Sequence, residues 1–330
     1  MTRLARLRPD TFTTALVGVV VLATVLPATG VVAEAWHVAT QIAIALLFFL
    51  HGARLSRQAV LAGLTHWRLH LIVIGFTFAI FPLLGVAFAQ LPEAILPSGL
   101  ALGLIYLCCL PSTVQSSIAF TSIAGGNVAA AVCSASASSL FGVAFTPLLV
   151  GLLMRASGNA ISLEQVEAIF TQILLPFVVG QIVHPWVGAW ALRNKKVLSV
   201  FDRGSILMVV YGAFSAAVIN GLWHRLTPLA SVALVLVCSA LLAILLVSTT
   251  WTARRLGFNR ADEITIVFCG SKKSLAAGVP MANILFPAAS VGMIVLPLMV
   301  FHQIQLMVCA VLARRYARRN AGAAPEPEAT

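Results

Sequence analysis

Long apolar stretches separated by short basic segments constrain the fold of this chain more than any other feature. A helix needs about 20 apolar residues to cross the hydrocarbon core of a bilayer. Ten such stretches run over residues 11–29, 34–53, 69–90, 97–123, 127–153, 166–188, 204–222, 228–251, 262–286 and 290–313. The pattern predicts an all-α polytopic membrane protein with ten transmembrane helices, because a lipid-embedded helix satisfies its own backbone.

The composition excludes a soluble protein. Of the 330 residues, 60% are hydrophobic and 9% are charged, which leaves too few polar residues to cover a water-exposed surface. The net charge of +11 could indicate a nucleic-acid partner, but the basic residues lie at the ends of apolar stretches, where they set membrane orientation. We therefore expect a lipid bilayer as partner and no nucleic acid, and the oligomeric state stays open.

The basic residues also predict the orientation. With a cytoplasmic N-terminus, the outside loops contain only Arg155 and Arg225. The inside segments then contain Arg3, Arg6, Arg8, Arg54, Arg57, Arg68, Arg193, Lys195, Lys196, Arg203, Arg254, Arg255, Arg260, Arg314, Arg315, Arg318 and Arg319. This asymmetry predicts a multi-pass protein of the cytoplasmic (inner) membrane with both termini in the cytoplasm.

The fourth and ninth apolar stretches each contain an internal break. In the fourth, Pro111 is followed by a run of small and polar residues that cannot continue an undisturbed helix. In the ninth, the polar run Ser271 to Ser274 interrupts the apolar sequence. Each broken stretch is followed by one that carries a proline, Pro147 or Pro297.

These positions divide the chain into two halves of five stretches. We expect residues 1–155 to form a first repeat, residues 156–316 a second repeat, and residues 317–330 a disordered tail that lacks large apolar side chains. An odd number of spans in each half makes the two repeats inverted with respect to one another. Inverted repeats with discontinuous helices are a common plan of secondary transporters.

A broken membrane helix exposes carbonyl groups on one half and N–H groups on the other, and its N-terminal end attracts anions. The candidate substrate-binding residues are therefore the polar residues of the two breaks: Ser112, Thr113, Gln115, Ser116, Ser117, Ser271, Lys272, Lys273 and Ser274. A serine at such a position can equally cap the broken backbone or bond a neighbouring helix.

Lys272 and Lys273 are the most unusual residues of the second break. A lysine at the bilayer centre costs about 2.5–3.5 kcal/mol on insertion scales, and neighbouring helical side chains point about 100° apart. We therefore expect at least one of the two to face an aqueous cavity.

Four further polar residues at membrane depth are candidates for ion coupling: Ser134, Ser136, His302 and Gln305. His302 and Gln305 are three residues apart and should share a helix face, and a histidine can titrate near neutral pH. His302 can also be a packed, hydrogen-bonded residue with no role in coupling.

The chain has no recognisable catalytic set. Its aspartates, Asp10, Asp202 and Asp262, lie at the ends of predicted helices, and no metalloprotease, nucleophile-elbow or P-loop motif occurs. The six cysteines have no C-x-x-C spacing and form neither a disulfide framework nor a zinc site. We expect no enzyme activity, no cofactor and no resident metal.

Several motifs resemble one transporter family. The run from Pro111 to Pro147, and the segment from Leu175 to Gly180, resemble the bile acid:sodium symporter family, solute carrier family 10. Residues 269–276, followed by Gly278-Val-Pro-Met, are similar to the member 7-like, SBF-like branch. The resemblance implies crossed broken helices four and nine in a core domain. It also implies a panel domain of helices one, two, six and seven, with substrate bound between the domains and alternating access.

The chain departs from the symporters at the positions that bind sodium in that family. The resemblance places Ser116-Ser117 where the symporters have Ser-Asn, Val267 where they have a sodium-binding glutamate, and a lysine close by. An ammonium group repels Na⁺. Neither sodium coupling nor bile acid as substrate is therefore expected here.

Three functions remain open from the sequence. The first is secondary transport of a small organic anion, without sodium or with protons. The second is a non-transporting membrane regulator, because the member 7 branch is associated with calcium homeostasis. The third is a metalloid exporter that uses the cysteines near the breaks, Cys108, Cys109, Cys133 and Cys269.

Overall fold

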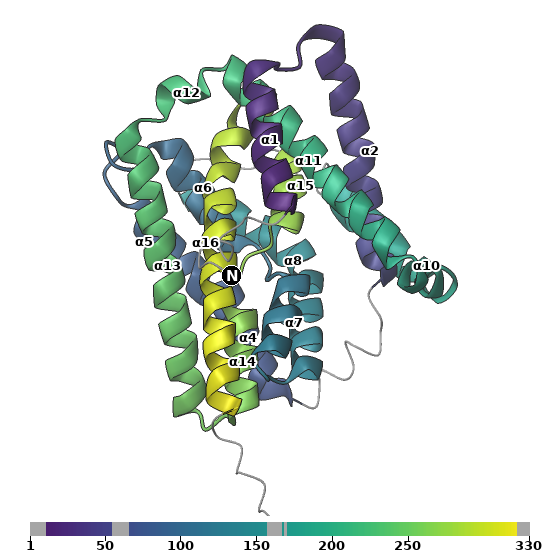
Figure 1. Ribbon diagram of the computed structural model, residues 1–330. Helices are drawn as coiled ribbons and strands as arrows, with labels where there is room; N and C mark the ends of the chain where they lie inside the picture. Colours follow the sequence, from purple (N-terminus) through teal and green to yellow (C-terminus); the bar gives the residue numbers. More distant parts are fainter. Residues whose placement is uncertain (1–10, 55–65, 157–166, 168–169, 322–330) are drawn as a thin grey trace, which may run out of the picture.

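The computed structural model describes residues 11–54, 66–156, 167 and 170–321, and these residues form a bundle of helices without strands (Figure 1). The elements are α1 (Thr11–Val25), α2 (Gly30–Arg54), α4 (Trp67–Gly75), the π-helical η3 (Phe76–Ile80), α5 (Phe81–Ala89), α6 (Ser98–Cys109), α7 (Val114–Ile123), α8 (Val128–Ala156), the π-helical η4 (Phe170–Leu174), α10 (Leu175–Arg193), α11 (Lys195–Ile219), α12 (Leu222–Arg225), α13 (Pro228–Arg255), α14 (Arg260–Gly270), α15 (Leu275–Leu285) and α16 (Ala288–Ala321).

The helices confirm an all-helical, multi-pass membrane protein. In the described residues, seven helices are long and apolar enough to cross a membrane, or eight if the bent pair α6 and α7 counts as one span. The predicted count of ten is not confirmed. Helix α1 has 15 residues, a length of about 22 Å against a hydrocarbon core of about 30 Å. Helices α14 and α15 have 11 residues each.

Two predicted boundaries are wrong. Helix α11 begins at Lys195 and not at residue 204, and its added turns carry Asp202, which accepts two hydrogen bonds from Arg54 of α2 at 2.6 and 3.1 Å. Residues 317–321 belong to α16 and not to a disordered tail. This last turn is held because Asn320 Nδ2 donates to Ala124 O at 2.9 Å. The predicted disorder of residues 322–330 lies outside the described residues.

The helices pack as two groups. Helices α1, α2, α10 and α11 contact one another and form what we call the panel group. Helices α4 to α8 and α13 to α16 form the core group. Figure 1 shows α2 and α10 side by side at one edge of the molecule. Helix α11 lies between this pair and the core group, because it contacts α2 on one side and α15 and α16 on the other.

Two glycines allow α2 and α10 to approach closely. A Cβ atom on Gly52 would collide with the Phe177 carbonyl, and one on Gly180 would collide with the Phe49 carbonyl. The close approach lets Gln181 Nε2 donate to Gly52 O at 2.5 Å. Small residues at such contacts are typical of packed membrane helices.

We predict that Gly180→Ala destabilises the protein, because the added methyl group forces the backbones of α2 and α10 apart. Overpacking of this kind typically costs about 1–3 kcal/mol. The measurement is the thermal unfolding midpoint of the detergent-solubilised protein. Gly75→Ala is the matched control, since its Cβ would meet no atom within 4 Å. Equal midpoints for the two variants would contradict the predicted close packing.

Candidate functional site

The two predicted breaks meet in space. Helix α6 ends at Cys109, α7 begins at Val114, and the two are bent by 63°. Helix α14 ends at Gly270 and α15 begins at Leu275. The Ser274 N–H donates to Pro111 O at 2.9 Å, so the segments 110–113 and 271–274 are in direct contact. We call these two segments and the helix ends beside them the crossing.

Hydroxyl groups of the first break bond the carbonyls at the end of α14. The Ser112 Oγ donates to Cys269 O at 2.6 Å, and the Ser117 Oγ donates to Phe268 O at 3.0 Å. Within the second break, Ser271 Oγ donates to Val267 O at 2.6 Å. The last carbonyls of a helix have no partner within the helix. These three predicted site residues therefore satisfy backbone groups at the crossing.

The carbonyls at the C-terminal end of α6 accept hydrogen bonds from side chains of α8 and of the second break. The Cys109 O accepts a hydrogen bond from Thr146 Oγ1 at 2.9 Å. The Cys108 and Leu110 carbonyls accept hydrogen bonds from Lys273 Nζ at 2.7 and 2.5 Å. Each break thus supplies donors for the carbonyls that the other break exposes, which makes the two interdependent.

Lys273 is fixed at both its backbone and its side chain. The side chain of Gln305 accepts from the Lys273 N–H at 3.0 Å and donates to its carbonyl at 2.9 Å. The ammonium also donates to Thr77 O at 2.7 Å and lies 4.1 Å from the centre of the Phe81 ring. The residue is 0% exposed.

Lys272 is also 0% exposed, but its surroundings differ. Its Nζ donates to Ser116 O at 3.0 Å and lies 4.0 Å from the Phe120 ring centre and 5.3 Å from the Phe268 ring centre. The expectation that at least one lysine faces an aqueous cavity is wrong for this structure. Carbonyl dipoles and aromatic faces surround both ammonium groups, and no ion pair in the described part of the chain includes either one.

The remaining predicted residues of the breaks have mainly local partners. The Ser274 Oγ accepts from the Ala277 N–H at 3.2 Å and caps α15. The Thr113 and Ser116 hydroxyls lie 2.7 Å apart. Gln115 is exposed on α7.

Of the ion-coupling candidates, Gln305 bonds the crossing directly, through the backbone of Lys273. The His302 Nδ1 accepts from Gln305 Nε2 at 2.9 Å, which confirms that the two share a face. The Ser134 Oγ lies 2.7 Å from His70 Nδ1, between α8 and α4. Ser136 is half-buried on α8. The sequence analysis missed Thr77 and Thr146. A proline near each was the available signal, since Thr146 directly precedes Pro147 and Thr77 lies five residues before Pro82.

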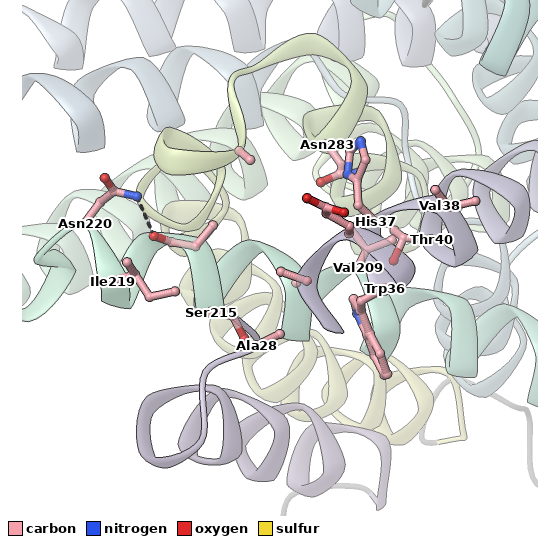
Figure 2. Close-up of a pocket in the computed structure, with 15 residues that line it drawn as sticks. Ala28, Trp36, His37, Val38, Thr40, Val209, Ser215, Ile219, Asn220 and Asn283 are labelled. Carbon is pink, nitrogen blue, oxygen red and sulfur yellow. Dashed lines mark hydrogen bonds between the residues drawn. The ribbon is translucent and has the colours of Figure 1, made fainter. Parts of the chain in front are cut away.

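A cavity of about 590 Å³ lies mainly between α2 and α11 of the panel group, and the core group reaches its edge with Asn283 and Ala288. Helices α2 and α11 line it on one side, and the end of α15 and the start of α16 line it on the other (Figure 2). Its polar lining residues are Glu34, His37, Thr40, Ser215, Asn220 and Asn283. Asn283 lies eight residues beyond Leu275 on α15, which places the cavity about 12 Å along the helix from the crossing.

Two hydroxyl groups of the cavity wall have no hydrogen-bond partner. Thr40 Oγ1 on α2 and Ser215 Oγ on α11 are both buried and unpaired, and both residues line the cavity. Buried polar groups are nearly always paired. Both oxygens are closed off from the open space of the cavity in this conformation, so each side chain has to rotate before its hydroxyl can bond a ligand there. Each stands as an isolated hydroxyl in an apolar stretch, which is why the sequence did not single them out.

The comparison with known proteins identifies the family. Residues 10–318 match the SBF-like CPA transporter family. The chain belongs to this family. An uncharacterized protein of Pseudomonas aeruginosa is 60% identical over 320 residues, covering 97% of this chain and 96% of that protein. "Putative symporter YfeH" of Escherichia coli K12 is 60% identical over 311 residues, 94% of each chain.

A more distant relative carries the name of the predicted branch. "Sodium/bile acid cotransporter 7" of Rattus norvegicus is 31% identical over 274 residues, covering 82% of this chain and 81% of that protein. The resemblance read from the two breaks is therefore confirmed. The chain is thus a multi-pass membrane protein of a transporter family.

We predict that Gln305→Leu strongly destabilises this transporter. The substitution leaves the buried N–H and carbonyl of Lys273 without partners, at about 1–3 kcal/mol for each group. The thermal unfolding midpoint in detergent measures the loss. Gln115→Leu on the exposed face of α7 removes the same amide group as a control and should change the midpoint little. A Gln305→Leu midpoint equal to that of the control would show that Gln305 does not hold the crossing.

Proposed function

We propose that this SBF-like transporter carries a small organic anion across the cytoplasmic membrane by secondary transport, and that the anion binds in the cavity that α2 and α11 form beside the core group. The observation that carries the proposal is the pair of unpaired hydroxyls, Thr40 Oγ1 and Ser215 Oγ, in the wall of that cavity. Hydroxyl and amide donors on both of its sides suit a carboxylate or a similar polar group.

The charge distribution favours an anion. Ala288, at the N-terminal end of the 34-residue helix α16, lines the cavity, and a helix N-terminus carries about half a positive charge. The two buried lysines of the crossing add positive charge in a low-dielectric region, where fields are screened little. Glu34 is exposed at the cavity, so water screens its negative charge.

Sodium coupling is not part of the proposal. Relatives of this chain are named as sodium/bile acid cotransporters, but here the Lys273 ammonium lies among the carbonyl oxygens of the crossing. A second cation at that position would be repelled. We therefore propose transport that is independent of sodium, either coupled to protons or uncoupled.

The proposed transport cycle uses the two-group architecture. Residues 1–155 and 156–316 are proposed as two inverted repeats of five spans, and the panel and core groups are proposed to move against each other. The direct contact between the breaks and the cavity between the groups support this plan. With both termini in the cytoplasm, the cavity would open to the outside. It is lined by Ala28 in the outer loop between α1 and α2, and by Ile219 and Ala288 at the outer ends of α11 and α16.

A non-transporting membrane regulator is the second candidate. The many hydrogen bonds that lock the crossing favour it, since a locked crossing needs no substrate for its stability. Metalloid export has less support. No three histidine, cysteine or acidic side chains gather in the described residues, so no multi-thiol site is formed there.

We predict that the purified protein in liposomes takes up small carboxylates equally well in sodium and in choline buffer. Thr40→Val and Ser215→Ala should each raise the KM about tenfold, because each removes a hydrogen bond worth roughly 1.4 kcal/mol. Ser239→Ala on the exposed side of α13, where the hydroxyl bonds Val235 O, is the control.

Two outcomes would contradict this proposal. Uptake that occurs in sodium buffer and not in choline buffer would contradict the proposed sodium-independent transport. Failure of any organic anion in a broad panel to raise the unfolding midpoint would favour the non-transporting regulator.

We also predict the orientation of the termini. Alkaline phosphatase, which is active only outside the cytoplasm, should be inactive when fused after Thr330. It should be active when fused after Leu226, between α12 and α13, because this loop is expected outside. Green fluorescent protein at the same two points should give the opposite result. Active phosphatase at Thr330 would make the predicted number or direction of spans wrong.

A further inference from the structure

The Thr77 carbonyl beside Lys273 is available because the local sequence removes its usual donors. In the π-helical segment η3, the Phe81 N–H bonds Phe76 O. The next residue is Pro82, which has no N–H to donate. The carbonyl of Thr77 is thus turned to the Lys273 ammonium, at 2.7 Å.

The two carbonyls of the first break are available for a different reason. In an unbroken helix the Ser112 N–H would bond Cys108 O, but here it donates to Ser138 Oγ at 2.9 Å. Leu110 has an extended backbone with ψ of 156°, so its carbonyl lies outside the helical pattern. Both oxygens point to Lys273 Nζ, at 2.7 and 2.5 Å.

These three oxygens form a cage around one positive charge. An ammonium group has three N–H donors, and each has a carbonyl partner here. The face of the Phe81 ring closes the cage at 4.1 Å from Nζ. Rings of backbone carbonyls also bind monovalent metal ions in membrane proteins, where they replace the hydration shell.

We propose that the carbonyls of Thr77, Cys108 and Leu110 form a monovalent-cation site that Lys273 fills with its own ammonium group. Unpaired carbonyls at membrane depth are costly, so the site needs a cation, and a covalently tethered one cannot dissociate. The proposal deepens the sodium-independent function by giving its structural cause. It rests on the geometry of the crossing and does not depend on which substrate is carried.

Lys272 provides a control within the same segment. It is as buried as Lys273, but its ammonium has one carbonyl partner, Ser116 O, and two aromatic neighbours, Phe120 and Phe268. A metal ion requires several oxygen ligands. Truncation of Lys272 should therefore leave no site for a free ion.

The experiment measures the unfolding midpoint of purified Lys273→Ala in detergent, in sodium, potassium, n-propylammonium or choline chloride at equal ionic strength. n-Propylammonium has the three carbons and the ammonium that the substitution removes, whereas choline is too bulky for the cage. We expect the midpoint of Lys273→Ala to be lowest in choline and about 5 °C higher in at least one other salt. Wild type and Lys272→Ala should have the same midpoint in all four salts.

Two results would overturn the proposal. One is a Lys273→Ala midpoint that is the same in all four salts. The other is a salt-dependent shift in wild type or in Lys272→Ala that is as large as the shift in Lys273→Ala. Lys273→Ser, which adds a hydroxyl oxygen to the cage, is measured in parallel. If neither Lys273 variant can be purified as a monodisperse protein in any of the salts, the cage does not accept a free cation and the proposal is wrong. No transport is measured, so failure of the proposed anion uptake is a separate result.

Discussion

The carbonyl groups that a broken helix exposes within a membrane must find donors, and the crossing depends on this constraint. Water is absent from the hydrocarbon region, and each unpaired group costs several kcal/mol. Here the donors for the end of α14 are hydroxyls of the first break, and the main donor for the end of α6 is a lysine of the second. Neither break would be stable alone, because each completes the hydrogen bonding of the other.

The two neighbouring lysines show how one segment can bury two positive charges without a carboxylate. A charge inside a protein is tolerated when dipoles replace its hydration. Lys273 receives three carbonyl oxygens, whereas Lys272 receives one carbonyl and two aromatic faces. Their side chains reach opposite sides of the crossing, one toward α5 and α6 and the other toward α7. The two ammonium groups thereby connect the second break to α6 and α7 within the core group.

The sequence was sufficient to locate the breaks, because Pro111 and the polar run from Ser271 to Ser274 conflict directly with an apolar helix. It was not sufficient to assign their polar groups. A sequence shows that Ser112 has a hydroxyl, but not that a carbonyl of α14 lies 2.6 Å away. The expectation that a lysine faces an aqueous cavity was wrong for the same reason. It did not allow for the carbonyl oxygens and aromatic rings that replace water around both ammonium groups. The sequence could not predict the unpaired hydroxyls of Thr40 and Ser215, because only tertiary packing leaves them buried without partners.

The contrast between the crossing and the cavity bears on how the proposed transport could work. A ligand shifts a conformational equilibrium only through contacts that differ between the two states. The crossing is rigid, because hydrogen bonds connect α6, α7, α14, α15 and α16 there. The contact of α11 with α16 is formed by small residues that pack closely: a Cβ on Gly292 would collide with the side chain of Ala217 and approach the carbonyl of Ala213. Apolar contacts of this kind are non-directional, unlike the hydrogen bonds of the crossing. In the proposed cycle the movement therefore occurs at this contact, beside the cavity, while the crossing moves as one body with α15 and carries the cavity's inner wall with it.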